Sequence, residues 1–309
     1  TPELSALTSD LDGRLYLGDR VNNRISIYDW RKNEILDVFG SLGQSRSQFR
    51  DITYLAVNAR GQVAVLDRKN KKVEVYQLEQ TRFADPLTSD LIELASSLEV
   101  ACESMHAFSA AKTLCIKPDH KGIVILGEDG AELGEFASIA KKPSAIHVAG
   151  ESVAILDKNQ LHAFNLDGEN LFTIGRYGTS AGGFKDPNDV FVHKGQYYVA
   201  DKGNNRVQVF AADGQFVEEI KAKQDGKSLF IDVGPIAVDS QDNLYIADAS
   251  ALGLIHVISK SREKIATLGI EQDSIHKVKK YYALDIDQQD RLYVLAGSDF
   301  NEYFITIYK

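Results

Sequence analysis

The sequence lacks several features that would assign it to a class of protein. No stretch of 18 residues is free of charge, so the chain has no segment typical of a transmembrane helix. It has no low-complexity linker, and we expect one domain over residues 1–309. Its two cysteines, Cys102 and Cys115, do not make a disulfide framework, and we predict two buried thiols. The net charge of −9 argues against binding of nucleic acid by the whole surface.

The motifs of common enzyme classes are also missing. The seven histidines show no H-x-x-x-H or other metal-binding spacing. No G-x-S-x-G nucleophile motif, P-loop or dinucleotide-binding motif occurs. The D-x-D-G of residues 10–13 matches only the start of a calcium-binding loop, and we interpret it as a hairpin turn. We therefore predict no cofactor, no bound metal and no catalytic residue.

What the sequence does contain is short runs of alternating apolar residues. Residues 186–220 hold four of them, DVFVH, QYYVAD, RVQVFA and QFVEEI, separated by turns rich in Gly, Asn and Asp. Alternation with a period of two between such turns is typical of antiparallel strands joined by hairpins. We predict a four-stranded antiparallel sheet over this segment.

The same pattern recurs along the chain. Seven copies align, over residues 4–40, 52–79, 105–136, 144–175, 186–220, 234–269 and 283–308. A period of about 40 residues with four strands per copy is typical of a β-propeller. We expect an all-β propeller of four-stranded antiparallel blades, with seven blades favoured and six as the alternative. The last copy has only three strands, and we expect residues preceding Thr1 to complete it, or the sheet to keep an open edge.

The turns between the strands resemble a known family. The pattern D-x-x-N-x-R stands at 19–24 and 201–206, with a diverged form at 67–72. The connectors 39–51 and 174–187 are similar to the G-x-x-G…F…P entry of an NHL repeat. The chain therefore resembles the NHL-repeat β-propellers. The resemblance implies a propeller, most often six-bladed in that family, and it allows binding of single-stranded RNA, as in animal developmental regulators.

One segment departs from the repeat. Leu91, Leu94 and Leu98 have the spacing of one face of a helix. Asp90 stands where an N-cap is expected. We predict a short helix at, or in place of, the outer strand of the second copy, either packed against the sheet edge or docking a partner.

Charges divide between the two ends of the expected blades. The turns between second and third strands share one end with the connectors between blades, and these segments hold more than half of the basic residues. The hairpins at the other end, such as SDLDG and GEDGAE, are rich in acid. We predict a basic face that binds an anionic partner. The candidate binding residues are Arg20, Arg24, Arg46, Arg50, Arg68, Lys72, Lys141, Lys142, Lys202, Arg206, Lys279 and Tyr282.

Some of these candidates have a structural interpretation as well. The pairs Asp19 with Arg24, and Asp201 with Arg206, either brace their own turns or bind a ligand. A residue outside the repeated motif, such as Arg46, is a better functional candidate.

The segment HKVKKYY has two interpretations too. Tyr281 and Tyr282, beside Lys279 and Lys280, provide a stacking surface for bases or sugars, or they begin a strand of the last copy.

The function we expect is a non-catalytic binding or scaffold module whose partner is a protein, a peptide or another anionic ligand. One alternative is a metal-dependent hydrolase or lyase with a cation in the central channel, near Asp189, Asp232 and Asp285. A second alternative is binding of single-stranded RNA, which the overall acidity disfavours. If the source is bacterial, we expect a periplasmic or extracellular location.

Overall fold

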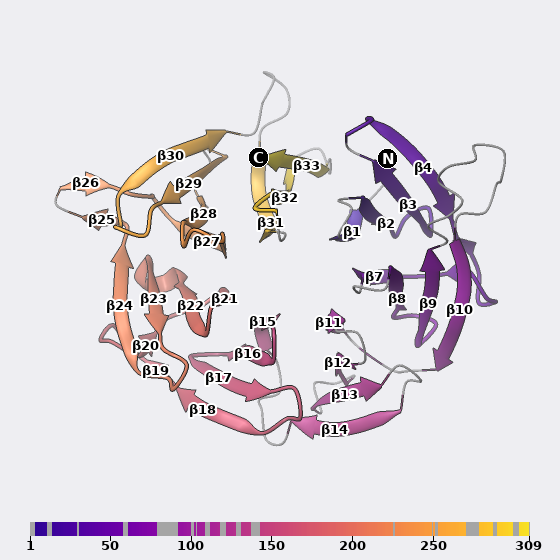
Figure 1. The fold of residues 1–309 in the computed structure, drawn as a ribbon, viewed down its shortest axis with the longest axis horizontal. Coiled ribbons are helices and arrows are strands. Elements are labelled where there is room, and N and C mark those ends of the chain that lie inside the picture. The colour runs from indigo at the N-terminus through magenta and orange to yellow at the C-terminus, as the bar shows by residue number, and fades with distance from the viewer. Residues whose placement is uncertain are drawn as a thin grey trace. The chain divides into compact units, whose positions relative to one another are not determined.

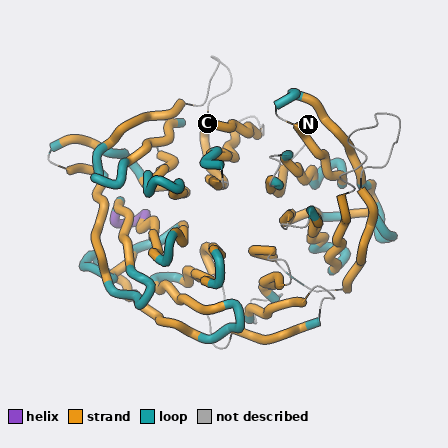
Figure 2. The backbone as a smooth tube through the Cα atoms, in the orientation of Figure 1, coloured by secondary structure: helices purple, strands orange, loops and turns teal. Residues whose placement is uncertain are grey.

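The computed structural model describes most of the chain as short β-strands (Figure 2). The described residues are 4–10, 14–29, 31–57, 61–78, 92–99, 102, 104–108, 112–117, 122–127, 131–136, 143–224, 226–248, 250, 253–269, 278–286, 289–298 and 303–308. They belong to two compact units, Thr1–Ser138 and Ile139–Lys309, and each unit is considered by itself. No helix in the described ranges is both long and apolar enough to cross a membrane.

The first unit contains three four-stranded antiparallel sheets (Figure 1). The first sheet has β1 (Leu4–Ser9), β2 (Leu15–Asp19), β3 (Arg24–Asp29) and β4 (Glu34–Phe39). The second has β7 (Ile52–Val57), β8 (Gln62–Asp67), β9 (Lys72–Leu78) and β10 (Ile92–Glu99). The third has β11 (Ser104–Phe108), β12 (Lys112–Ile116), β13 (Ile123–Gly127) and β14 (Glu132–Phe136). The connector between the first two sheets carries β5 (Ser41–Leu42) and β6 (Gln48–Phe49), which pair in parallel.

The second unit contains three more four-stranded antiparallel sheets and one of three strands. The first four-stranded sheet has β15 (Pro143–Ala149), β16 (Ser152–Asp157), β17 (Gln160–Asn165) and β18 (Asn170–Ile174). The second has β21 (Asp189–His193), β22 (Gln196–Asp201), β23 (Arg206–Phe210) and β24 (Phe216–Lys221). The third has β27 (Val233–Val238), β28 (Leu244–Asp248), β29 (Leu254–Ile258) and β30 (Lys264–Gly269). The three-stranded sheet has β31 (Val278–Ile286), β32 (Leu292–Ser298) and β33 (Tyr303–Tyr308). The connectors carry β19 (Arg176–Tyr177) with β20 (Gly183–Phe184), and β25 (Lys223–Gln224) with β26 (Lys227–Ser228), and the turn after β22 is the 3-10 helix η3 (Lys202–Asn204).

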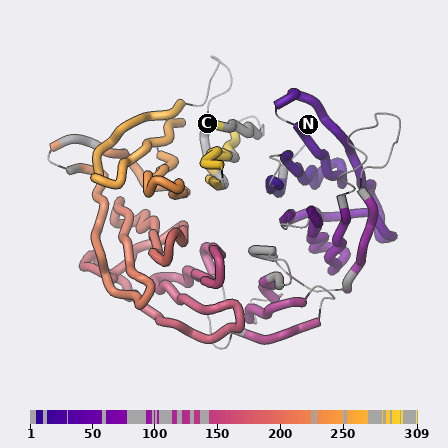
Figure 3. The backbone as a smooth tube through the Cα atoms, in the orientation of Figure 1, coloured from indigo at the N-terminus to yellow at the C-terminus, as the bar shows by residue number. Residues whose placement is uncertain are grey.

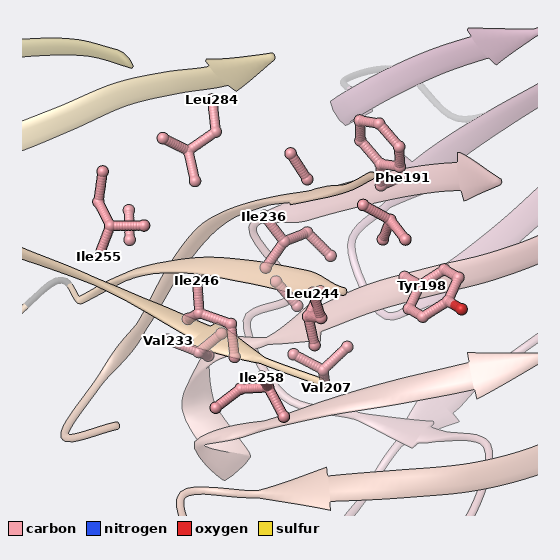
Figure 4. Close-up of a cluster of buried hydrophobic side chains, with 14 of the residues drawn as sticks. Phe191, Tyr198, Val207, Val233, Ile236, Leu244, Ile246, Ile255, Ile258 and Leu284 are labelled. Atoms are coloured by element: carbon pink, nitrogen blue, oxygen red, sulfur yellow. The ribbon is translucent and has the colours of Figure 1, made fainter. Parts of the chain in front are cut away.

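Each four-stranded sheet consists of strands that are consecutive in the sequence, as the colour along the chain shows within each unit (Figure 3). Within the second unit, β21 lies beside both β15 and β27, so neighbouring sheets stack through their first strands. The second strands are sandwiched between sheets and are almost wholly apolar, as in β16 and β22. Figure 4 shows the resulting core, in which Phe191 and Val207 of one sheet meet Ile236 and Leu244 of the next. Burial of these side chains is the main stabilising contribution, because one sheet alone covers only part of its apolar surface.

The expected antiparallel sheet over residues 186–220 is confirmed. The four runs form β21 to β24, and the hairpin register pairs Asp189 with Ala200 and Asp201 with Arg206. Three strands are described in the last copy, as the sequence indicates.

The predicted helix near Leu94 is wrong. Residues Ile92–Glu99 form the strand β10, which pairs antiparallel with β9, and Asp90 and Leu91 lie outside the described residues. The leucine spacing is compatible with either structure, and β9 needs a partner for its free backbone groups. A bulge between Leu94 and Ser96 places the partly buried Leu94 against the core of the first two sheets. Strand pairing therefore outweighs the local helical preference.

The prediction of two free thiols is also wrong. Cys102 and Cys115 form a disulfide with a Cα–Cα distance of 5.5 Å. Both residues are buried, as predicted, and they lie in the core shared by the second and third sheets. The sequence does not show this pairing, because it depends on how the segment before β11 returns to β12.

Candidate binding site at the connectors

Two connectors between sheets, one in each unit, have the same construction. In the first unit Leu42 pairs with Phe49, and in the second Tyr177 pairs with Phe184. The two phenylalanines are buried in the core, whereas Leu42 and Tyr177 are each 69% exposed. The backbone hydrogen bonds match as well, since Gly43 N donates to Phe49 O as Gly178 N donates to Phe184 O. Each connector therefore anchors one apolar residue inside and presents another outside.

The turn between the second and third strands is bonded to the connector that precedes its sheet. The Nδ2 atom of Asn70 donates to Gly43 O at 2.7 Å, and Nδ2 of Asn204 donates to Gly178 O at 2.8 Å. Gly203 is needed for this approach, because a Cβ there would lie 2.6 Å from the carbonyl oxygen of Lys185. In these two sheets the turn and the connector therefore form one continuous surface, as the sequence predicts.

The aspartate of the D-x-x-N-x-R motif holds the turn and the connector together. Asp67 accepts hydrogen bonds from the backbone N–H groups of Arg50 and Asp51, at 2.9 and 3.1 Å. Asp201 accepts one from the N–H of Lys185 at 2.7 Å. Both carboxylates are buried, so the motif aspartates are structural anchors.

In the first unit, acidic and basic residues of this surface differ in exposure. Residues 19–24, 40–51 and 67–71 contain three acidic residues, and all three are buried. They also contain seven basic residues, all of them exposed: Arg20, Arg24, Arg46, Arg50, Arg68, Lys69 and Lys71. The exposed charge is therefore positive, although the chain has a net charge of −9. We name these three segments the first connector surface.

The second unit has an equivalent surface over residues 175–186, 201–206 and 221–232, which we name the second connector surface. Its exposed basic residues are Arg176, Lys185, Lys202, Lys221 and Lys223. Asp186 is exposed as well, and Glu219 on the adjoining strand pairs with Lys221 at 2.7 Å. The excess of positive charge is thus smaller than in the first unit.

Two of the predicted binding residues are buried. Lys72 donates through Nζ to Glu74 at 2.9 Å and to Ser45 O at 2.9 Å, and it lies over the ring of Phe49. Arg206 bonds to Asp201, and its whole guanidinium group is used in hydrogen bonds. Both side chains tie a connector to the third strand, which sequence reasoning did not predict for Lys72.

The remaining candidates are placed only in part. Lys141 and Lys142 lie outside the described residues. Lys279 and Tyr282 belong to β31, which confirms the strand interpretation of this segment, and Tyr281 is buried. The stacking role of Tyr282 stays a prediction.

The other end of the sheets in the second unit is charge-compensated. Asp242 is bonded to His193 at 3.0 Å, to Lys194 at 2.8 Å and to Lys260 at 2.8 Å. Hydrogen bonds from the two lysines hold the pKa of Asp242 well below its usual range. The lysines at this end therefore meet a carboxylate, Asp242. On the first connector surface Arg68 meets the buried Asp51 at 2.8 Å and Arg24 lies 3.7 Å from the buried Asp19.

Two titratable groups on first strands bridge neighbouring sheets. Nδ1 of His147 accepts a hydrogen bond from Val192 N at 3.1 Å, and burial lowers the pKa of His147 to about 4. Asp189 accepts one from Ile236 N at 2.9 Å, and burial raises its pKa to about 7 although backbone N–H groups oppose the shift. Among the described residues, no group of three or more His, Cys, Asp and Glu side chains is placed to hold a metal ion.

A polar relay that was not expected from the sequence crosses three neighbouring strands of one sheet, β28, β29 and β30. Nε2 of His256 bonds to the buried Asp248 at 3.0 Å, and Nδ1 lies 3.3 Å from Oγ1 of Thr267. Burial favours the neutral form of Asp248, but hydrogen bonds from His256 and Ser250 outweigh it and hold its pKa below the usual range. His162 and Thr173 occupy the same register in another sheet, at 3.1 Å. Because it recurs, this arrangement is more consistent with architecture than with a catalytic site.

Comparison with known proteins supports the fold. A family model described as a 6-bladed beta-propeller matches residues 183–256, and no curated protein matches the chain. Among solved structures, virginiamycin B lyase from Staphylococcus aureus is 12% identical with a TM-score of 0.66, over 98% of this chain and 94% of the lyase. Its catalytically inactive form with quinupristin is 10% identical with a TM-score of 0.67, over 100% and 95%. Hsv2 from Kluyveromyces lactis is 9% identical with a TM-score of 0.65, over 100% and 98%.

These likenesses define the class of protein. The chain is an all-β propeller built from four-stranded antiparallel blades, and identities this low indicate a shared fold alone. The expectation of seven blades is not supported, because the matching family is described with six. Six, the alternative drawn from the sequence, is the number in that description; the described residues form six four-stranded sheets and the three-stranded sheet of β31 to β33. The likeness to NHL repeats stays a prediction.

Proposed function

We propose that this β-propeller is a non-catalytic binding module that engages an anionic partner through its connector surfaces. The observation that carries the proposal is the difference in exposure on the first connector surface, where seven basic residues are exposed and three acidic residues are buried. Such a surface attracts an anionic partner and orients it on approach.

The structure of the connectors supports a binding role for the exposed basic residues. Buried aspartates and the asparagine side chains of the turns form hydrogen bonds with the connector backbone. The charged side chains are therefore attached to an ordered backbone. A surface that is ordered before binding loses less conformational entropy when the partner arrives. The disulfide between Cys102 and Cys115 fits an oxidising compartment, such as the periplasmic or extracellular location expected if the source is bacterial.

The test uses poly-L-glutamate as the anionic probe and fluorescence anisotropy as the readout. We expect binding that weakens as NaCl is raised, because salt screens exposed charges. Arg46→Glu combined with Arg50→Glu reverses two exposed charges of the first connector surface and should abolish most of the binding. The control, Arg31→Glu combined with Lys264→Glu, changes the net charge equally on exposed residues outside the connector surfaces. Equal binding by the two variants would contradict the proposal.

A further inference from the structure

The two connectors share an apolar feature that the fold does not need. Leu42 and Tyr177 occupy the same position in their connectors, and both are 69% exposed. An exposed side chain of this size contributes little to the core, whose contacts here come from the paired Phe49 and Phe184. Single exposed apolar residues are common on proteins, so exposure alone does not define a site.

The second observation is the charge around each of these residues. Leu42 lies in the first connector surface with Arg46 and Arg50, both exposed. Tyr177 follows the exposed Arg176 directly in the chain. Both are therefore exposed apolar side chains on a surface with exposed cations, which is the composition of an interface centre with a charged rim.

The turn after β22 connects Tyr177 to a second exposed apolar residue, Ile231, through hydrogen bonds to the connectors that carry them. Asn204 binds Gly178 O, next to Tyr177, and Nδ2 of Asn205 donates to Ile231 O at 2.6 Å. Ile231 is itself 52% exposed. The exposed Lys202 belongs to the same turn, so one hydrogen-bonded segment carries both the apolar and the basic side chains. Figure 1 labels the connector strands β19 and β20.

We infer that the partner of the connector surfaces is an acidic peptide segment with an apolar or aromatic side chain, which packs on Tyr177 or Leu42 while its carboxylates meet the surrounding basic residues. This inference rests on the proposed function and specifies the partner's chemistry. Tyrosine suits the role because it provides a large contact area at small cost in side-chain entropy. Complementary charge selects the acidic flanks, and apolar contact selects the residue between them.

Two synthetic peptides of equal charge test the inference on the full chain. One has a central Phe flanked by glutamates, and in the other Ala replaces that Phe. We expect the Phe peptide to bind about tenfold more tightly, and Leu42→Ala combined with Tyr177→Ala to remove this preference. Tyr177→Phe should retain it. Leu171→Ala combined with Ile265→Ala, which removes two other exposed apolar side chains, should retain it as well.

The outcomes separate the two claims. If both peptides bind equally and Arg46→Glu with Arg50→Glu weakens both, the apolar anchor is wrong and the anionic-partner proposal stands. If neither peptide binds, both claims are wrong. Vesicles of phosphatidylserine and phosphatidylcholine provide the last arm. Should the alanine variants weaken vesicle binding and leave the peptide preference unchanged, the anchor contacts a membrane, and the peptide inference is overturned.

Discussion

The carboxylate of Asp201 accepts a hydrogen bond from Nε of Arg206 at 2.9 Å, and both side chains are buried. Nη1 of the same arginine reaches Glu219 at 2.8 Å, and Nη2 reaches Gly183 O at 2.8 Å. One guanidinium therefore joins a turn, an outer strand and the connector that precedes the sheet. The pair braces the turn and its connector, which is one of its two interpretations from the sequence.

Removal of this brace is expected to be costly. Arg206→Leu leaves Asp201 buried without its cation and should lower the free energy of unfolding by about 3–5 kcal/mol. Arg24→Leu is the matched control, because its side chain is 47% exposed and its Nε lies 3.7 Å from Asp19. Because the arginine of this pair is exposed to solvent and the contact is long, the pair should contribute about 1 kcal/mol or less, although Asp19 is buried. Urea unfolding compares the two variants, and equal losses would show that burial of the pair does not matter.

Asp189 should make the protein less stable as the pH rises. Its pKa is about 7 in the fold and 3.8 in the reference state, so the folded chain binds more protons between these values. Stability due to this group is therefore full below about pH 4 and lost as the pH rises to 7. Asp189→Asn should remove this dependence on pH. At pH 7 the free energy of unfolding of the variant should exceed that of the wild type by about 1–4 kcal/mol. Urea unfolding at pH 4, 5.5 and 7 measures the free energy of unfolding of both proteins. If the two free energies change with pH in the same way, Asp189 is not the cause of the pH dependence.

His147 should act in the opposite direction. Burial lowers its pKa from 6.5 to about 4, so the unfolded chain binds the extra proton first as the pH falls. Its contribution is present above pH 6.5 and is lost as the pH falls towards 4. His147→Gln keeps an acceptor for Val192 N without this titration, and should be less sensitive to acid in the same measurement. A variant as acid-sensitive as the wild type would rule the explanation out.

The disulfide should stabilise the first unit. Cys102 and Cys115 are 13 residues apart in sequence, and closing a loop of this size in the unfolded chain contributes about 3 kcal/mol. Replacing both by Ala should therefore lower the midpoint of urea unfolding. Thiol titration of the unfolded wild-type protein is the check, with no reactive thiol expected before reduction and two after it. Two reactive thiols without reductant would exclude the bond.

The strands were the part of the fold most accessible from the sequence. The runs in residues 186–220 became β21 to β24 because alternation and turn residues are local signals. The helix predicted around Leu94 was wrong because its leucines fit one face of a helix. The spacing of the leucines does not show that the segment pairs with β9.

The site was only partly accessible. Arg46 and Arg50 are exposed, as expected from their place in a connector, and their binding role stays a prediction. The burial of Lys72 was not expected, because it depends on Glu74 and Phe49 around it. The hydrogen bond by which Asp189 joins two neighbouring sheets could not be predicted either, because its partner Ile236 is 47 residues further along the chain. Contacts of that kind come from the stacking of neighbouring blades and have no local signal.

Hydrogen–deuterium exchange with and without poly-L-glutamate shows directly whether the connector surfaces bind an anionic partner. We expect the probe to slow exchange in the connector surfaces, at residues 40–51, 67–71, 175–186 and 201–206. Turns at the other end, such as 211–215 and 239–243, should exchange at the same rate in both samples. Protection confined to those turns, or absent everywhere at saturating probe, would contradict a binding role for the connectors.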